Sequence, residues 1–219
     1  MPSPSISVAV DTIIFTIRKN ELCALLIQMK KKPYTGQWAF PGGRIEANET
    51  TEEAAMRILQ TQTNVAHVYL EQLKTFDEVK RDALERVVSV AYFALVAEDD
   101  LVLKTTEKYA DVKWLPVKKL PSLAYDHKLI AKEAVNRLKG KLQYTNIVWS
   151  LLPKAFTLTD LQRVYEIILD TTLDKRNFRK RILSLNLIIP TGNKRSGDAN
   201  RPAELYQFKQ RKLTYVEMM

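Results

Sequence analysis

The pattern of apolar and polar positions predicts that the chain opens with a β-hairpin. Residues 8–17 and 22–29 are nearly continuous apolar and β-branched runs, and Lys19-Asn20 between them supplies a turn. After a Gly-Gly loop, apolar residues recur at helical spacing over residues 50–63. We therefore expect two buried strands and then a first helix.

Two further strands and a second helix are expected in the middle of the chain. Residues 87–96 form another apolar run, and residues 112–115 form a short one. Residues 126–138 follow a helical pattern, and Gly140 is placed to end that helix. The composition of the chain changes directly after this glycine.

Charge is distributed unevenly along the 219 residues, which carry a formal net charge of +9. Residues 1–140 hold 20 Lys and Arg against 18 Asp and Glu, whereas residues 141–219 hold 14 against 7. A strongly basic part suits a polyanion such as nucleic acid, although the solvated face of a small domain has a similar composition. We place a domain boundary near Leu142, with one domain over residues 1–142 and a second over residues 143–219.

The second part has the element order of a winged helix-turn-helix. Thr157 and Asp160 have the spacing of a capping box, which predicts a helix start, and Asp174 is a suitable N-cap for a second helix with one basic face. Two β-like runs, residues 187–190 and 205–208, bracket a basic loop that contains glycine. We therefore expect a small α+β domain ordered as helix, turn, basic helix and basic hairpin.

This order predicts an interface with double-stranded DNA. In a winged helix-turn-helix the start of the second helix reaches base edges in the major groove, and the basic hairpin reaches phosphates or a minor groove. The candidate DNA-binding residues are Lys175, Arg176, Asn177, Arg179, Lys180, Arg181, Lys194, Arg195 and Arg201. A domain this small reads only a short half-site, so we expect a homodimer on a palindromic operator.

The composition excludes some classes of protein. The sequence has no run of 18 apolar residues, and its start lacks a secretory signal pattern, so neither a membrane span nor export is expected. Its single cysteine, Cys23, can form neither an internal disulfide nor a cysteine-based zinc site. These features predict a cytoplasmic protein.

Residues Trp38-Ala-Phe-Pro-Gly-Gly43, followed by Glu49 and Arg57, resemble the Nudix box. That box reads Gly, five residues, Glu, seven residues and then Arg, and this chain has Gly43, Glu49 and Arg57 at the same spacing. The resemblance covers most of residues 6–140. It implies a Nudix-type α/β/α sandwich around a mixed sheet. We expect Glu49 and Arg57 to pair and so brace a loop against the helix.

The chain departs from Nudix enzymes at their metal-binding carboxylates. Those enzymes carry three glutamates where this chain has Ile58, Thr61 and Gln62. Carboxylates at i, i+3 and i+4 share one helix face and can hold Mg²⁺ against a diphosphate, whereas Thr and Gln lack the charge. We therefore expect no metal site, no cofactor and no enzymatic activity. The alternative is a Nudix hydrolase of ADP-ribose that uses other carboxylates nearby, namely Glu46, Glu49, Glu52 or Glu53.

A second segment bears on the ligand. Nudix relatives that bind ADP-ribose carry an Arg-Asp-Pro-Arg-Gly-like turn, and this chain has Arg81-Asp-Ala-Leu-Glu-Arg86 at that place, where Arg81 and Asp82 match and residues 83–85 depart. The guanidinium groups of Arg81 and Arg86 are able to donate paired hydrogen bonds to a phosphate or to a ribose edge. A solvated loop that binds no ligand is an equally good interpretation of this segment. The residues expected to bind an effector are Phe40, Gly42, Gly43, Arg44, Arg81, Asp82, Arg86 and His127.

Three segments of the second part, residues 156–162, 173–182 and 201–206, resemble the C-terminal domain of Nudix-related transcriptional regulators. These are best known as regulators of NAD metabolism, and the resemblance covers nearly all of residues 148–208. It implies a repressor whose Nudix-like domain senses ADP-ribose or, in relatives that control sugar use, a pentose such as arabinose. An RNA-binding module is a third interpretation, and it would bind unrelated RNAs with comparable affinity.

Overall fold

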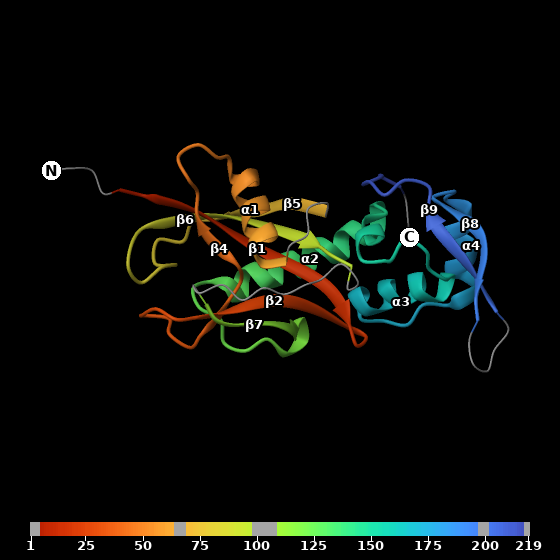
Figure 1. Ribbon diagram of the computed structural model, residues 1–219, viewed down its shortest axis with the longest axis horizontal. Coiled ribbons are helices and arrows are strands. Elements are labelled where there is room, and N and C mark those ends of the chain that lie inside the picture. The colour runs from red at the N-terminus through yellow and green to blue at the C-terminus, as the bar shows by residue number, and fades with distance from the viewer. Residues whose placement is uncertain (1–4, 64–68, 98–108, 197–201, 217–219) are drawn as a thin grey trace. The chain divides into compact units, whose positions relative to one another are not determined.

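The chain forms two compact units that divide between Asn136 and Arg137. The computed structural model, drawn in Figure 1, describes residues 5–63, 69–97, 109–196 and 202–216. Over these residues, no helix combines the length and the apolar character that a membrane crossing needs. Each unit has buried apolar residues of its own, so the two are described separately.

The first unit opens with the predicted hairpin. Strand β1 (Ser7–Arg18) pairs antiparallel with β2 (Glu21–Met29). The two residues between the strands, Lys19 and Asn20, have positive φ angles of 48° and 65°. Positive φ at both central residues gives a two-residue turn the twist that the flanking strands require.

A mixed sheet is built around this hairpin, with seven strands in the described part of the chain. Strand β1 pairs in parallel with β6 (Val87–Leu95), and the other pairings in the sheet are antiparallel. The remaining elements around it are β3 (Trp38–Ala39), β4 (Gly42–Arg44), β5 (Tyr69–Phe76), β7 (Tyr109–Pro116) and the short helix η2 (Val117–Lys119). The main path runs β3-β2-β1-β6-β5, while β4 pairs with β1 and β7 pairs with β2.

Strand β5 is an element that the sequence pattern does not predict. Its buried residues are Tyr69, Leu73 and Phe76, and intervals of four and three residues are typical of a helix face rather than of strict alternation. The irregular interval arises from a β-bulge between Gln72 and Lys74, where the register against β6 shifts. Pairing with β6 therefore decides the conformation of this segment.

Helix α1 (Thr51–Thr63) matches the predicted helix and begins with a capping box. The Thr50 hydroxyl accepts the backbone N–H of Glu53 at 3.2 Å, and the Glu53 carboxylate accepts the backbone N–H of Thr50 at 2.7 Å. The Glu53 carboxylate therefore takes part in the N-terminal cap of α1.

Helix α2 (His127–Tyr144) runs further than predicted. Gly140 was expected to end it, but the helix continues through this glycine to Tyr144. Leu138 and Leu142 on either side are fully buried, and packing of that face outweighs the cost of about 1 kcal/mol for a glycine inside a helix. The helix therefore crosses the division between the units, and the boundary predicted near Leu142 falls inside it.

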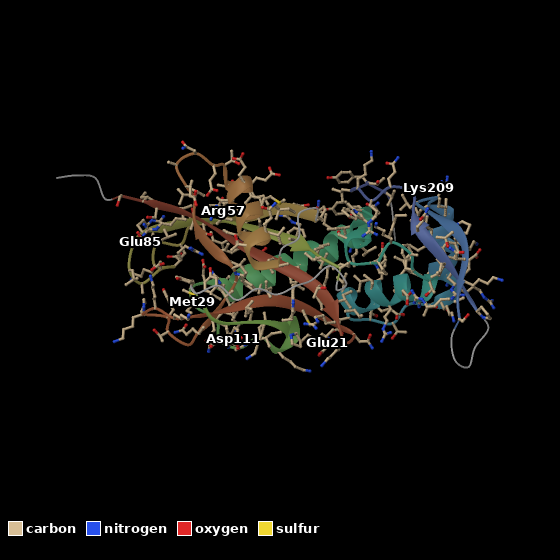
Figure 2. The ribbon with its side chains drawn as sticks, in the orientation of Figure 1. Glu21, Met29, Arg57, Glu85, Asp111 and Lys209 are labelled. Atoms are coloured by element: carbon tan, nitrogen blue, oxygen red, sulfur yellow. The ribbon has the colours of Figure 1, made fainter. Side chains whose placement is uncertain are left out.

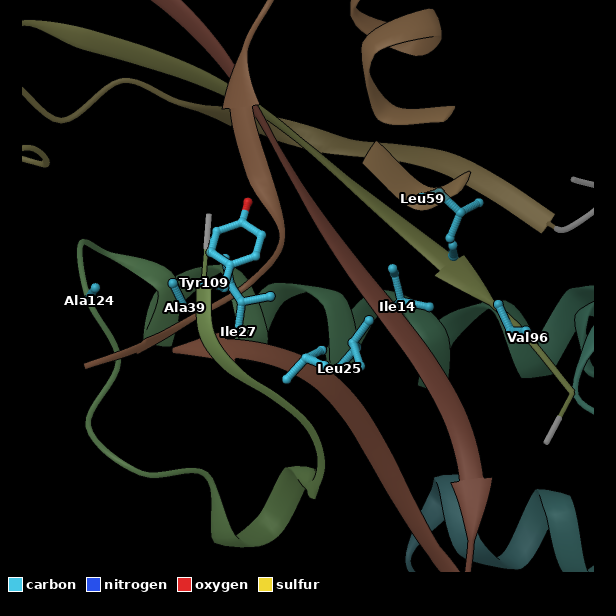
Figure 3. Close-up of a cluster of buried hydrophobic side chains, with 10 residues drawn as sticks. Ile14, Leu25, Ile27, Ala39, Leu59, Val96, Tyr109 and Ala124 are labelled. Carbon is cyan, nitrogen blue, oxygen red and sulfur yellow. The ribbon is translucent and has the colours of Figure 1, made fainter. Parts of the chain in front are cut away.

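Helices cover both faces of the sheet, which gives the α/β/α sandwich that the resemblance implies (Figure 1). Val10 on β1 packs against Ile58 and neighbouring residues of α1. Asp11 points to the opposite face, because side chains alternate along a strand, and there it meets His127 at the start of α2. Figure 3 shows Ile14 and Leu25 in the core between these layers.

The second unit follows the predicted order of elements. A short helix, η3 (Ile147–Ser150), precedes α3 (Leu158–Leu169), which begins with the predicted capping box between Thr157 and Asp160. The turn after α3 uses Asp170 in the left-handed conformation, with φ of 60°. The helix-turn-helix predicted from the sequence is therefore confirmed.

The basic helix and the hairpin complete the winged helix domain. Helix α4 (Lys175–Ser184) has Asp174 as its N-cap, and the Asp174 side chain accepts the backbone N–H of Asn177 at 2.8 Å. Strands β8 (Ile188–Arg195) and β9 (Ala203–Phe208) pair antiparallel and form the wing. Strand β8 extends beyond the predicted run, because its pairing with β9 resumes after a register shift.

Candidate functional site

A cavity of about 270 Å³ opens in the first unit, where the ends of several strands meet the start of α2. Seven of the eight residues predicted to bind an effector line it, namely Phe40, Gly42, Gly43, Arg44, Arg81, Asp82 and His127. Figure 2 labels two further lining residues, Met29 and Glu85, and Figure 3 shows Ile27 and Tyr109, which belong to the same wall. The cavity is slightly smaller than most ligand pockets, which measure roughly 300–1,000 Å³.

Gly42 is required by the close approach of β4 to β1. A Cβ at this position would lie 2.3 Å from Oδ1 of Asp11 and 2.9 Å from the carbonyl oxygen of Val10. The second of these is backbone, so it could not move aside without distorting β1. Gly42 of the Nudix-like box thus brings the chain close to a buried carboxylate.

That carboxylate belongs to a buried charged network. Oδ2 of Asp11 accepts hydrogen bonds from Nη2 of Arg81 at 3.0 Å and from the Ser89 hydroxyl at 2.7 Å. Arg81 also donates to both oxygens of Asp126, at 2.7 and 3.1 Å. Burial opposes ionisation of Asp11, but His127, Ser89 and Arg81 outweigh it and hold the pKa of Asp11 well below its usual value.

His127 is fixed in one tautomer. The backbone N–H of Phe40 donates to Nδ1 of His127 at 2.9 Å, and a backbone N–H can donate only to an unprotonated nitrogen. The ring proton is therefore on Nε2, which faces Oδ1 of Asp11 at 3.3 Å. The imidazole links the strand segment at Phe40 to the buried network beneath the pocket.

The structure places the two arginines of residues 81–86 differently. The guanidinium of Arg81 is not in a solvated loop, because its side chain is only 3% exposed and is bonded to two carboxylates. Arg86 does not line the cavity: its Nη1 donates to the carbonyl oxygens of Glu78 and Val87, at 3.4 and 3.1 Å. Burial and local backbone partners therefore separate the two arginines.

The accessible charges of the pocket lie on its rim. Arg44 and Glu85 form an ion pair, and the Ser7 hydroxyl donates to Glu85 at 2.9 Å. Arg44 and Ser7 lower the pKa of Glu85. Asp82 accepts the backbone N–H of Leu84 at 2.8 Å, which fixes the turn that carries both acidic groups.

The Nudix helix presents no carboxylate at the positions where the enzymes bind metal. Ile58 is 6% exposed and packs in the core. Nε of Arg57 donates to Glu49 at 2.8 Å, so the predicted brace is confirmed, and this bond lowers the pKa of Glu49 to about 2. Among the described residues, no cluster of three or more acidic, cysteine or histidine side chains is placed to hold a metal ion.

In the second unit, the predicted DNA-binding residues lie on α4 and β8. Five of those on α4 are exposed (Lys175, Arg176, Asn177, Lys180 and Arg181), as are Lys194 and Arg195 on β8. Arg179 is half-buried and donates to the Thr159 hydroxyl at 3.2 Å, while Arg195 pairs with Asp160 at 2.8 Å. Arg179 and Arg195 thus converge on the first turn of α3. Arg201 lies outside the described residues.

Sequence reasoning missed several residues of the pocket, above all Asp11. A signal for Asp11 exists, because a carboxylate in the middle of an apolar strand must find partners when it is buried. Tyr125 and Glu85 also line the cavity and carry no comparable signal.

Comparisons with known proteins agree with this architecture. A NUDIX domain model matches residues 6–138, and a model of the NrtR DNA-binding winged helix domain matches residues 148–208. The chain is 34% identical over 209 residues to the ADPR responsive transcriptional repressor NtrR of Acinetobacter baylyi, and the match covers 94% of this chain and 83% of that protein.

Two solved structures are similar to parts or most of the chain. NrtR of Shewanella oneidensis complexed with a 27mer DNA is 35% identical with a TM-score of 0.83, covering 92% of this chain and 93% of that chain. The NUDIX domain of the same NrtR complexed with ADP ribose is 34% identical with a TM-score of 0.54, covering 61% of this chain and 89% of that chain.

The fold and the two sites define a Nudix domain joined to a DNA-binding winged helix. Over 94% of its length the chain matches a transcriptional repressor. The chain belongs to the NrtR family of Nudix-related transcriptional regulators.

Proposed function

We propose that this protein is a transcriptional repressor that binds operator DNA through its winged helix and responds to ADP-ribose bound in its Nudix domain. The observation that carries the proposal is the presence of both sites in one chain, which aligns over 92% of its length with an NrtR solved on DNA. A pocket supplies the sensor, and an exposed basic helix supplies the contact with a polyanion.

The pocket offers groups that suit ADP-ribose. Arg44 on the rim is a cation for the diphosphate, and the carboxylates of Asp82 and Glu85 are acceptors for ribose hydroxyls. A related Nudix domain has been solved with this ligand. A pentose such as arabinose has hydroxyls but no anionic group, so it offers no charge to pair with the cation of Arg44. We therefore favour ADP-ribose over the pentose as effector.

The Nudix domain, in this proposal, has lost hydrolysis and kept binding. Ile58 replaces a carboxylate and lies in the core, and three of the four alternative glutamates are engaged, since Glu46 and Glu49 contact Arg57 and Glu53 caps α1. We expect no release of AMP from ADP-ribose with Mg²⁺. Turnover near ~1 s⁻¹, the low end of usual enzyme rates, would support the hydrolase instead.

Two winged helix domains, one from each subunit of a homodimer, are proposed to bind the operator together. Residues at the start of α4 would enter the major groove of the DNA. Lys194 and Arg195 of the wing would contact the phosphate backbone of the DNA beside that groove. One such domain reads a short half-site, so a homodimer on a palindrome is needed for specificity. Analytical ultracentrifugation with and without a palindromic duplex tests the dimer directly.

Helix α2 is the proposed link between effector and operator. It begins at the pocket network, where Asp126 holds Arg81 and His127 faces Asp11, and it continues into residues of the second unit. A ligand that changes this network changes the start of the helix. Coupling of this kind typically amounts to ~1–3 kcal/mol, or about 5- to 150-fold in operator affinity.

The regulated process follows from the effector. ADP-ribose is NAD without its nicotinamide, so a repressor that senses it is suited to control of NAD metabolism. As a DNA-binding repressor the protein would work in the compartment that holds the DNA, and the cytoplasm stays our prediction.

Fluorescence anisotropy on the upstream intergenic DNA tests the proposal. The protein is titrated at one near-physiological salt concentration, because phosphate contacts make affinity strongly salt-dependent, first alone and then with ADP-ribose or arabinose. We expect sequence-specific binding that ADP-ribose changes and arabinose does not. Equal binding to scrambled DNA or to unrelated RNA would contradict the operator assignment. A response to arabinose alone would select the sugar regulator.

A further inference from the structure

Tyr125 has a backbone conformation that a bulky side chain rarely adopts. Its φ angle is +56°, in the left-handed region. The residues on both sides fix this conformation: the backbone N–H of Ala124 donates to the carbonyl oxygen of Trp38 at 2.8 Å, and Asp126 is held by two bonds from Arg81. Backbone strain of this kind persists where surrounding contacts impose it, and it is frequent at ligand clamps.

The ring of Tyr125 lies on the wall of the cavity, against a second tyrosine. Its centroid is 4.2 Å from that of Tyr34 and 5.1 Å from that of His127. The hydroxyl of Tyr34 accepts the backbone N–H of Ala83 at 3.0 Å. The Tyr34 ring, which packs against Tyr125, is therefore anchored to the turn that carries Asp82. Burial and the charge of Asp82 raise the pKa of Tyr125 to about 12, so its hydroxyl stays protonated at neutral pH.

The rest of the lining contains both apolar and charged residues. Ile27, Met29 and Tyr109 are apolar or aromatic, whereas Arg44 and Glu85 carry charge. A ligand that matches both kinds of residue has a flat aromatic part and an anionic, hydroxyl-rich part. A pentose lacks the first of these, whereas a nucleotide sugar has both.

We propose that Tyr125, supported by Tyr34, is the stacking platform for the base of a purine nucleotide effector and the residue that selects a nucleotide over a free pentose. The inference rests on the proposed function and specifies how its effector is recognised. An aromatic face tolerates any base, and stacking of a base on an aromatic side chain is a recurrent source of affinity. The imposed backbone conformation keeps the ring in place before the ligand arrives.

The test compares two ligands on three forms of the full chain. Isothermal titration calorimetry gives the affinity of ADP-ribose and of ribose 5-phosphate, which lacks the base, for the wild type, Tyr125→Phe and Tyr125→Ala. We expect Tyr125→Ala to weaken ADP-ribose binding by about 5- to 150-fold, the range reported by alanine substitution at stacked bases. Tyr125→Phe keeps the ring and should bind ADP-ribose nearly as well as the wild type. Ribose 5-phosphate, which lacks the whole AMP part of ADP-ribose, should not distinguish the three forms. If it binds none of them, the comparison of Tyr125→Ala with Tyr125→Phe on ADP-ribose decides the proposal.

A further variant separates stacking from backbone strain. Tyr125→Gly removes the same ring and relieves the left-handed conformation, so it should melt above Tyr125→Ala and bind ADP-ribose as weakly. Unchanged ADP-ribose affinity in Tyr125→Ala, or an equal loss for both ligands, would overturn the platform. Absence of ADP-ribose binding in the wild type would overturn the proposed function itself, and this inference with it.

Discussion

The two units use their charged residues in opposite ways. In the first unit, Arg81 has a side chain that is 3% exposed and is bonded to Asp11 and Asp126. In the second unit, Lys175 and Arg176 lie exposed on α4. A buried charge must be paired because desolvation is costly, whereas exposed cations are available to a polyanion. Burial, rather than residue type, therefore separates an arginine that holds the fold together from one that is available to a partner.

The largest expected effect comes from breaking the buried network. Arg81→Met keeps a long side chain but leaves Asp11 and Asp126 buried without their guanidinium partner. Removing one partner of a buried pair typically costs ~3–5 kcal/mol, so the free energy of unfolding in urea should fall by about that amount. Arg86→Met is the matched control, because Arg86 is half-buried and contacts only backbone carbonyls in the described structure, and it should cost about 1 kcal/mol. Equal losses would mean that Arg81 has no special structural role.

The next effect concerns the basic surface of α4, where Arg181 is exposed and Arg179 is half-buried and donates to the Thr159 hydroxyl. Replacing Arg179 and Arg181 with Ala should abolish measurable operator binding, since each specific contact with a base is worth ~1–3 kcal/mol. The lost hydrogen bond should lower the free energy of unfolding by only about 1 kcal/mol. The double change Lys118→Ala/Lys119→Ala removes the same charge from exposed positions of η2 and should leave operator affinity unchanged. Unchanged affinity in the α4 variant would show that this helix does not read DNA.

A smaller effect compares the helix caps of the two units. Thr157→Ala removes the hydroxyl that accepts the backbone N–H of Asp160 at 3.1 Å, and loss of such a cap costs about 1 kcal/mol. Hydrogen exchange should report weaker protection in α3 and no change in α1. Thr50→Ala is expected to give the converse, because it removes the cap of α1. Loss of protection in both helices from either change would contradict independent capping of the two units.

The smallest effect is the pH dependence of the half-buried brace between Glu49 and Arg57. The pKa of Glu49 is lowered from 4.5 to about 2, chiefly by its bond with Arg57. A lowered carboxyl pKa stabilises the fold above pH 4.5, and this contribution is lost as the pH falls through 2. Glu49→Gln should therefore melt slightly below the wild type at pH 6, with the difference disappearing near pH 2. A constant difference across this range would exclude ionisation of Glu49 as its cause.

Much of the fold could be predicted because its signals are local. The hairpin over β1 and β2, the helical spacing of α1, the capping box of α3 and the N-cap of α4 depend on residues within a few positions of one another. Seven of eight expected pocket residues do line one cavity, since the Nudix resemblance supplied their positions. Whether they bind an effector is still a prediction.

The failures have a common physical cause in contacts between distant segments. Strand β5 has irregular spacing because a bulge adjusts it to β6, and Gly140 stays helical because Leu138 and Leu142 are buried beside it. Neither the register against β6 nor the burial of these two leucines is visible from a local window of sequence.

The amino-acid pattern alone therefore accounts for the order of elements, the basic character of α4 and the loss of the metal-binding carboxylates, all of which depend on residue type and spacing. Only the folded chain decides that Arg81 joins Asp11 and Asp126, which lie 70 and 45 positions away, and that Tyr125 is held in a left-handed conformation at the pocket wall. The reason is that desolvation selects the partner of a buried charge, and packing on both sides of a residue imposes its backbone angles.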